Sequence, residues 1–193
     1  MQRLGVLGGT FDPIHTGHVL LAQFTAERLG LDRVLFVPAA DPPHKGQCAA
    51  SAEDRRVMVE LAIEGFPTFA ASRLELERPG KSYTIDTLRH LHQAHPEVQL
   101  YLIIGADNVA PFSSWHNPKG ILELCTVVAG TRLSPREEAD PELERRLVYI
   151  DTPAVQFSST QIRQRLSQGQ PIRYLVPEKV EEYLRRQGLY QTR

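Results

Sequence analysis

Short apolar runs rich in β-branched residues alternate along the chain with helical hydrophobic patterns. The apolar runs predict strands at residues 4–7, 34–37, 69–76, 98–104, 125–129 and 147–150. The helical patterns predict helices at residues 18–29, 52–64, 84–94, 136–146, 159–167 and 177–186. This alternation predicts an α/β fold with a mainly parallel sheet, covered on both faces, that binds ligands at the carboxyl ends of its strands. With 193 residues and no internal repeat, we expect one domain over residues 1–193.

The charge balance limits the partners of the chain. Its 22 basic and 23 acidic residues nearly cancel, which leaves a net charge of −1. A nucleic acid polymer or an anionic membrane surface requires a basic field, so neither is expected as a partner. Cys48 and Cys125 lie far apart without a CxxC pair, which predicts reduced thiols. We recognise no signal peptide and no apolar run long enough to cross a bilayer, and we expect a cytoplasmic protein.

The stretch GGTFDPIHTGH, residues 8–18, follows the first predicted strand. Gly8 and Gly9 lack a Cβ, which lets backbone N–H groups approach a ligand closely. A helix is predicted to begin near His18, and its N-terminus offers unpaired N–H groups and a positive dipole end that suit a phosphate. His15 and His18 can both point toward the same anion as hydrogen-bond donors. We therefore favour a phosphate site here, although neither a P-loop nor a GxGxxG turn is present.

Two other interpretations of this turn stay open. One is a plain strand–turn–helix junction, in which Asp12 and Pro13 supply turn chemistry and the histidines are exposed or capping. The other is a zinc site at His15 and His18, completed by His44 or Asp12. A zinc ion needs three or four ligands at defined spacing and the HExxH pattern is missing, so zinc is the weaker alternative.

A second informative stretch is FSSTQIRQRL, residues 157–166. Ser158 and Gln161 fit a capping box, which predicts the start of a helix. Two serines and a threonine crowd this N-terminus, and Arg163 lies in its first turns. Hydroxyl and N–H donors together with a guanidinium can bind phosphate, so this helix start is a second candidate anion site. Two such sites in one sheet fit a polyphosphate better than a monophosphate.

Together, residues 8–18 and 158–163 resemble the paired signatures of the nucleotidyltransferase superfamily that carries the HxGH motif. Within it, the chain resembles bacterial nicotinate-nucleotide adenylyltransferases through further segments in the family's order, at residues 42–45, 81–88, 104–108, 115 and 173–177. These matches span almost the whole chain. The resemblance implies a Rossmann-like, doubly wound fold with a small C-terminal helical part.

The resemblance also implies an activity: transfer of AMP from ATP to nicotinate mononucleotide, forming deamido-NAD and pyrophosphate, with Mg²⁺ accompanying ATP. It implies the catalytic residues His15, His18 and Arg163. The implied ATP-binding residues are Gly8, Gly9, Thr10, Phe11, His15, His18, Lys45, Gly105, Asp107, Ser158, Thr160 and Arg163. The implied residues for nicotinate mononucleotide are Tyr83, Thr84, Asp107, Trp115 and His116. No side chain is expected to bind a metal ion, and the oligomeric state stays open, a homo-oligomer included.

By the same resemblance, Thr10 and the two histidines contact the ATP phosphates and steady the α-phosphorus as charge builds. Ser158, Thr160 and Arg163 hold the β- and γ-phosphates that leave as pyrophosphate, and Lys45 closes over the phosphates. The nucleophile is a phosphate oxygen of the mononucleotide. Its second pKa is about 6, so it is largely ionised near neutral pH and requires no protein base.

At the acceptor end, the resemblance places the nicotinate group near Thr84, Trp115 and the backbone of His116, and a ribose hydroxyl near Asp107. An indole face stacks on a pyridine ring, while N–H and hydroxyl groups donate to a carboxylate. Without the resemblance, Trp115 is a surface-turn aromatic and Thr84 an N-cap.

One segment departs from the family pattern. After the strand at 125–129, the family shows an arginine followed by proline and glycine, whereas this chain has GTRLS at residues 130–134. Arg132 is a candidate to serve from a shifted position. Two functions of other kinds stay open: a different nucleotidyltransferase, acting on phosphopantetheine or using CTP, and a nucleotide-binding module without catalysis.

Overall fold

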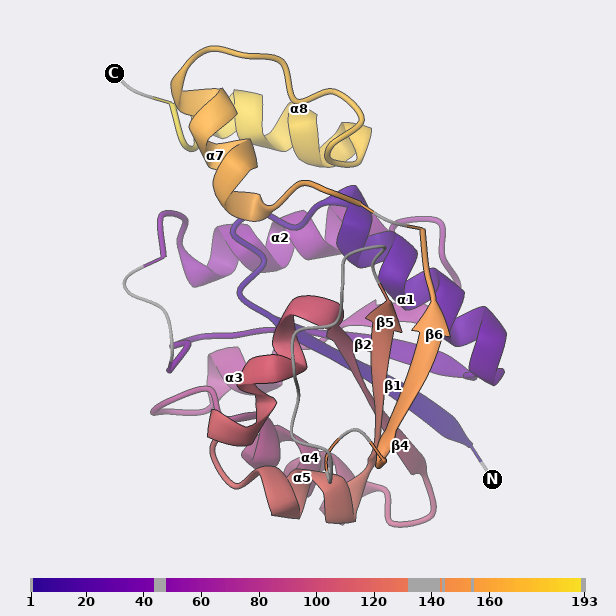
Figure 1. Ribbon diagram of the computed structural model, residues 1–193. Coiled ribbons are helices and arrows are strands. Elements are labelled where there is room, and N and C mark those ends of the chain that lie inside the picture. The colour runs from indigo at the N-terminus through magenta and orange to yellow at the C-terminus, as the bar shows by residue number, and fades with distance from the viewer. Residues whose placement is uncertain (1, 44–47, 132–142, 144, 154, 192–193) are drawn as a thin grey trace.

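The computed structural model describes residues 2–43, 48–131, 143, 145–153 and 155–191. Its centre is a six-stranded, fully parallel sheet with the strand order β3-β2-β1-β4-β5-β6 (Figure 1). The strands are β1 (Arg3–Gly9), β2 (Arg33–Pro38), β3 (Phe69–Ala71), β4 (Gln99–Gly105), β5 (Thr126–Thr131) and β6 (Leu147–Asp151). This order is that of a doubly wound, Rossmann-like sheet, so the predicted fold class is confirmed.

Strand order reverses between β1 and β4, and the two strands separate there. β1 pairs with β4 only as far as Val6, opposite Leu102, but continues beside β2 as far as Gly9. β4 continues beside β5 as far as Gly105. A crevice therefore opens between the carboxyl ends of β1 and β4, at the switch point where such sheets bind ligands.

Helices cover both faces of the sheet because the strands alternate their apolar side chains between the faces. Leu7 and Ile103 belong to a buried cluster with the helices on one face, and Val6 and Leu102 to a cluster on the other. The first cluster includes residues of α1 (Thr16–Leu29), α2 (Ala52–Ile63), α7 (Ser159–Ser167) and α8 (Glu178–Gln187). The second includes residues of α4 (Thr84–Ala94), η2 (Ala110–Ser114) and α5 (Pro118–Leu124).

The C-terminal helices α7 and α8 lie together beside α2, away from the sheet (Figure 1). Ile162 of α7 and Val180 of α8 are fully buried in the same cluster as Met58 of α2. The predicted small C-terminal helical part is therefore present, and it packs on the helix layer rather than on the strands.

No helix in the described part of the chain is both long and apolar enough to cross a membrane.

The predicted strand at 69–76 is wrong in its second half. β3 ends at Ala71, and α3 (Leu74–Glu77) follows. The Ser72 N–H still donates to Phe36 O of β2, but the Ser72 hydroxyl then accepts the N–H of Leu74 and turns the chain out of the sheet. A local side-chain acceptor thus overrides the apolar content of this segment.

Most other predicted elements agree with the structure to within two residues. The helix predicted at 18–29 begins at Thr16, because the His18 side chain accepts the backbone N–H of His15 at 3.2 Å and extends the first turn. Gly8 and Gly9, expected just after the first strand, are its last two residues. The helix predicted at 136–146 lies almost wholly outside the described residues.

Packing of α7 on the helix layer can be tested at Ile162. This side chain is fully buried, so Ile162→Ala is expected to lower the free energy of unfolding by about 2–5 kcal/mol through lost burial and a residual cavity. Urea unfolding measures the change. The exposed Gln164 on the same helix is the control, and Gln164→Ala is expected to change stability by less than about 0.5 kcal/mol. Equal effects of the two substitutions would contradict this packing.

Candidate active site

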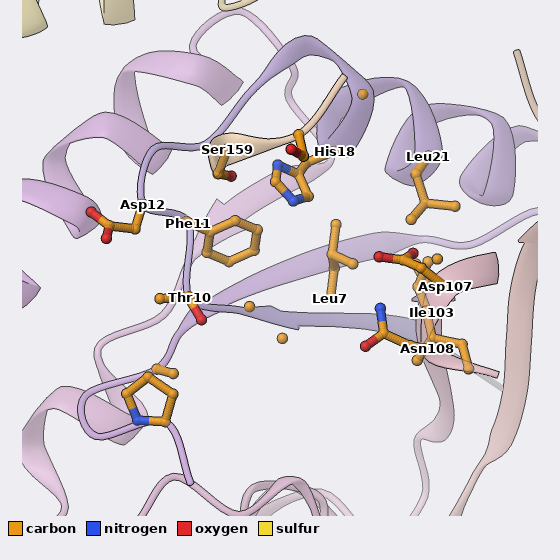
Figure 2. A pocket seen from close by; sticks show the side chains of 18 of the residues that line it. Leu7, Thr10, Phe11, Asp12, His18, Leu21, Ile103, Asp107, Asn108 and Ser159 are labelled. Carbon is orange, nitrogen blue, oxygen red and sulfur yellow. The ribbon is translucent and has the colours of Figure 1, made fainter. Parts of the chain in front are cut away.

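A cavity of about 920 Å³ opens at the carboxyl ends of β1 and β4. Figure 2 shows part of its lining, with Thr10, Phe11 and His18 from the turn after β1, and Asp107 and Asn108 from the turn after β4. The predicted site residues that line it are Gly8, Gly9, Thr10, Phe11, His15, His18, Tyr83, Thr84, Gly105, Asp107, Trp115, His116, Ser158, Thr160 and Arg163. Lys45 and Arg132 lie outside the described residues. One cavity thus collects every predicted site residue that the structure describes.

The two histidines at the start of α1 stack on each other. The His15 and His18 rings lie 3.7 Å apart between centroids, at 21° to each other. His18 Nδ1 accepts the backbone N–H of His15, so this hydrogen bond leaves Nε2 as the ring nitrogen that can donate. A Cβ at Gly17 would lie 3.1 Å from the His15 ring and from Val155, which explains a glycine between the histidines.

The Phe11 ring packs against the His18 ring and supports the start of α1. The Phe11 backbone is left-handed, with φ at 51°, and the ring meets the His18 ring edge-on at 5.1 Å between centroids (Figure 2). A Cβ at Gly9 would lie only 2.9 Å from the Phe11 ring. The glycine at the end of β1 is therefore required for the ring to fold under the strand end, and the backbone there stays open to a ligand.

The N-terminus of α7 is held against the same turn. Ser158 and Gln161 form the predicted capping box, which is confirmed. The Ser159 hydroxyl donates to Pro13 O at 2.8 Å, and Arg163 Nη1 donates to Asp12 O at 2.6 Å. Two helix N-termini, those of α1 and α7, therefore converge on one cavity and give it a positive potential suited to a polyphosphate.

Asp12 joins several parts of the site and is only 6% exposed. Its carboxylate accepts the backbone N–H groups of Ala49 and Ala50, at 2.9 and 3.1 Å, and the hydroxyl of Tyr190 at 2.6 Å. These donors occupy the oxygens that the zinc alternative would need, and His44 lies outside the described residues. The described part of the chain contains no group of three or more His, Cys, Asp or Glu side chains placed to hold a metal ion.

A buried arginine fixes the ends of β1 and β2 relative to each other. Arg55 of α2 is 1% exposed, and its Nη1 donates to Thr10 O and Ala39 O, both at 2.7 Å. The carbonyl oxygens of both strand ends thus obtain partners, and a guanidinium charge lies beneath the cavity. Sequence reasoning missed Arg55, because an arginine inside an amphipathic helix carries no local sign of burial.

The residues predicted for the acceptor site also line this cavity, and Tyr83 and Trp115 pack against the second buried cluster, whereas Phe11 belongs to the first. The rings of Tyr83 and His116 stack with centroids 4.3 Å apart, and Trp115 packs on Phe112 at 5.2 Å. Tyr83 is the N-cap of α4 and Thr84 its first residue, so the alternative assignment of Thr84 as the N-cap is wrong. The start of α4, the Thr84 hydroxyl and the Trp115 indole thus all line the cavity.

Asp107 follows β4 in the short helix η1 (Ala106–Asn108) and is exposed at the cavity wall (Figure 2). A Cβ at Gly105 would lie 2.5 Å from the Asp107 carboxylate. The Asp107 carboxylate therefore lies close against the end of β4, beside the switch point.

Glu75 and Ser82 also line the cavity and were not predicted. The Ser82 hydroxyl accepts the N–H groups of Ala40 and Asp41, at 2.9 and 3.2 Å, and donates to Glu75. Thr87 donates to Glu75 at 2.5 Å. This network connects the start of α4 to the loop after β2. Burial raises the pKa of the Glu75 carboxyl above its usual range, against the hydrogen bonds from Thr87 and Ser82.

Comparison with known proteins identifies the family of the chain. A family model described as cytidylyltransferase-like matches residues 6–165. The chain therefore belongs to the cytidylyltransferase-like family of nucleotide-transferring proteins.

Relatives that match over their full length identify a more specific family within this class. A protein named as a probable nicotinate-nucleotide adenylyltransferase from Halalkalibacterium halodurans is 45% identical over 194 residues, covering 100% of this chain and 93% of the relative. A protein of the same name from Herpetosiphon aurantiacus is 43% identical over 198 residues, covering 98% and 99%. The chain belongs to the nicotinate-nucleotide adenylyltransferase family.

Solved structures confirm the fold. The Plasmodium falciparum nicotinic acid mononucleotide adenylyltransferase complexed with NaAD superimposes with a TM-score of 0.80 at 18% identity, covering 98% of each chain. The same enzyme complexed with APC gives 0.79 at 19% identity, again covering 98% of each chain. At these identities the likeness establishes the fold alone.

The Glu75 network predicts a pH-dependent stability difference. Because the folded pKa is raised, the folded state binds this proton more tightly, and its stability falls as pH rises from the ordinary glutamate value toward the folded pKa. Below the ordinary glutamate pKa the carboxyl is protonated in both the folded and the unfolded state, so stability no longer changes with pH through this group. Glu75→Gln does not titrate, so the midpoint temperature of the variant minus that of the unmodified protein is expected to increase as pH rises above the ordinary glutamate value of 4.5.

Thermal unfolding across this pH range measures the difference. Glu77→Gln, which alters an exposed carboxylate of the same short helix, is the control and is expected to show a nearly constant difference. A pH-independent difference for Glu75→Gln would contradict burial as the cause.

Proposed function

We propose that the protein transfers AMP from ATP to nicotinate mononucleotide, forming deamido-NAD (nicotinate adenine dinucleotide) and pyrophosphate in NAD biosynthesis. One observation carries this proposal: a single cavity is lined by two helix N-termini and also by an indole with helix N–H and hydroxyl donors, which come from the helix layer on the other face of the sheet. The two helix N-termini suit a triphosphate, and the indole with its neighbouring donors suits a planar ring with a carboxylate. The full-length relatives named above support the same substrates.

The reaction joins the two substrates directly. A phosphate oxygen of nicotinate mononucleotide attacks the α-phosphorus of ATP, and the bond from that phosphorus to the α–β bridging oxygen breaks. The electron pair leaves with pyrophosphate. The attacking phosphate is already largely ionised near neutral pH, so the protein acts by positioning the substrates and stabilising charge.

The turn after β1 serves the α-phosphate. We assign His18, a donor through Nε2–H, and the adjoining Thr10 and His15 to charge that develops on the α-phosphate oxygens. Arg163, with the hydroxyls of Ser158 and Thr160, holds the β- and γ-phosphates that depart. Phe11 acts indirectly, because its ring supports His18.

The acceptor end recognises the nicotinate group. Trp115 stacks on the pyridine ring, and the Thr84 hydroxyl and the backbone N–H of His116 donate to its carboxylate. Tyr83, stacked on His116, steadies that turn, and Asp107 binds a ribose hydroxyl. An amide in place of the carboxylate would leave its own NH₂ facing donors, so the acid is preferred.

Magnesium enters with ATP rather than with the protein. Mg²⁺ usually keeps several waters and is held by substrate phosphates with one or two carboxylates, and the carboxylates of Asp12 and Glu75 are occupied by protein donors. The side chains present fit such a substrate-borne ion, which would neutralise phosphate charge.

We also place the protein in the cytoplasm, where its phosphorylated substrates occur, and expect it to act as one domain.

A pyrophosphate-release assay against a panel of acceptors tests the activity. Turnover is expected to be much faster with ATP and nicotinate mononucleotide than with ATP and phosphopantetheine. Binding of both substrates without pyrophosphate release would instead favour a nucleotide-binding module. Preference for phosphopantetheine, or for CTP with any acceptor, would overturn the assignment.

His18 provides a test of charge stabilisation. His18→Asn keeps an acceptor for the His15 N–H but loses the Nε2–H donor, so kcat is expected to fall by about a hundredfold or more while ATP binding changes little. Steady-state kinetics and ATP calorimetry measure the two quantities. Near-normal kcat in this variant would show that His18 only caps the start of α1 and does not stabilise charge.

The acceptor end is tested by Trp115→Ala. Loss of stacking is expected to raise KM for nicotinate mononucleotide about tenfold, with little change in KM for ATP, because the residues proposed to bind ATP do not include Trp115. Thr84→Val is expected to narrow the preference for the acid over the amide mononucleotide by removing one donor. If Trp115→Ala raised only the KM for ATP, the assignment of this pocket to nicotinate would be wrong.

A further inference from the structure

The C-terminal segment returns to the site after α8. Gly188 and Tyr190 both have left-handed backbone, with φ at 62° and 63°, and the chain between them folds back on the helix layer. Across 178 positions of sequence, the Tyr190 hydroxyl reaches Asp12 Oδ1 at 2.6 Å. A residue near the end of the chain thus contacts the middle of the turn that carries the two histidines.

Asp12 and Arg163 approach each other without forming a close ion pair. Arg163 Nη1 donates to the Asp12 carbonyl oxygen at 2.6 Å, while the distance from Nη1 to the carboxylate Oδ2 is 4.0 Å. The carboxylate instead accepts three other donors in the described chain: two backbone N–H groups and the Tyr190 hydroxyl. Arg163 keeps a side chain that is 31% exposed toward the cavity.

We propose that Tyr190 is a positioning residue of the active site, which satisfies the Asp12 carboxylate and so keeps Arg163 available to the phosphates of ATP. This inference rests on the proposed assignment of Arg163 to those phosphates. A buried carboxylate that loses a donor needs a replacement. Arg163 Nη1 lies 4.0 Å from Asp12 Oδ2, close enough to take that place, while the Arg55 guanidinium is already held by Thr10 O and Ala39 O. Without the Tyr190 hydroxyl, the guanidinium moves onto Asp12 and away from the ligand.

Two features keep the Tyr190 hydroxyl a donor. Burial raises the pKa of this phenol above its usual range, and the neighbouring Asp12 carboxylate raises it further. The hydroxyl is therefore a donor in the neutral range, and the bond does not switch with pH there.

The chain offers a matched control in Tyr183 of α8. Its hydroxyl donates to Asp54 Oδ1 at 2.7 Å, so it too is a tyrosine of the C-terminal part bonded to a carboxylate. Asp54 lies in the first turn of α2 and does not line the cavity. Tyr190→Phe and Tyr183→Phe each remove one hydroxyl of the same kind, but only the first touches the turn between β1 and α1.

Calorimetric titration with ATP, without an acceptor, separates this inference from the proposed reaction. Tyr190→Phe is expected to weaken ATP binding about tenfold, the effect of losing one hydrogen bond to a charged group. Tyr183→Phe is expected to leave it within about twofold. In turnover assays, Tyr190→Phe should raise KM for ATP and leave KM for nicotinate mononucleotide within about twofold.

A double-mutant cycle with Arg163→Lys tests the route of the effect. If Tyr190 acts through Arg163, adding Tyr190→Phe to Arg163→Lys should weaken ATP binding by less than about twofold further. Near-normal ATP binding by Tyr190→Phe, an equal loss in Tyr183→Phe, or full additivity with Arg163→Lys would each overturn the inference. Failure of the unmodified protein to turn over nicotinate mononucleotide would overturn the proposed function but not the ATP-binding result.

Discussion

Hydrogen bonds to the turn between β1 and α1 hold the rest of the site in place. The carbonyl oxygens of residues 10, 12 and 13 accept from Arg55, Arg163 and Ser159, which come from α2 and α7. The carboxylate of Asp12 adds the segment before α2 and the C-terminus of the chain. Because buried acceptors are costly to leave unpaired, these bonds determine where the two helix N-termini meet.

This arrangement suits a reaction that needs position and charge rather than a protein nucleophile. Two helix N-termini, the His18 imidazole and the Arg163 guanidinium line the cavity, and the Arg55 guanidinium is buried next to it against Thr10 O. All are fixed before a ligand arrives, so little reorganisation accompanies the developing charge. The separation of β1 from β4 beyond Val6 opens the crevice in which we propose that both substrates bind.

Local signals in the sequence predicted much of this structure. The helix at 84–94 and the helix at 159–167 have the predicted bounds, because periodicity and the Ser158 capping box act over a few residues. The same reasoning failed at residues 72–76, where a serine side chain turns the chain out of the sheet. Resemblance to a family, rather than periodicity, brought the acceptor residues around Trp115 into the prediction, and their roles stay predictions.

Residues whose role depends on distant partners gave no sequence signal. Arg55 has the appearance of a solvated helix residue, and Glu75 and Tyr190 that of surface residues, until folding brings them to Thr10, Ser82 and Asp12. Burial of a polar group is decided by tertiary packing, so a single sequence cannot indicate it.

Direct transfer between two substrates held in one cavity is tested by isotope exchange. The enzyme is incubated with ATP, Mg²⁺ and labelled pyrophosphate, with and without nicotinate mononucleotide. Direct transfer predicts that label enters ATP only when the mononucleotide is present, because no adenylyl group is held on the protein. Label entering ATP without an acceptor would reveal a covalent adenylyl-enzyme and contradict a mechanism based on positioning alone.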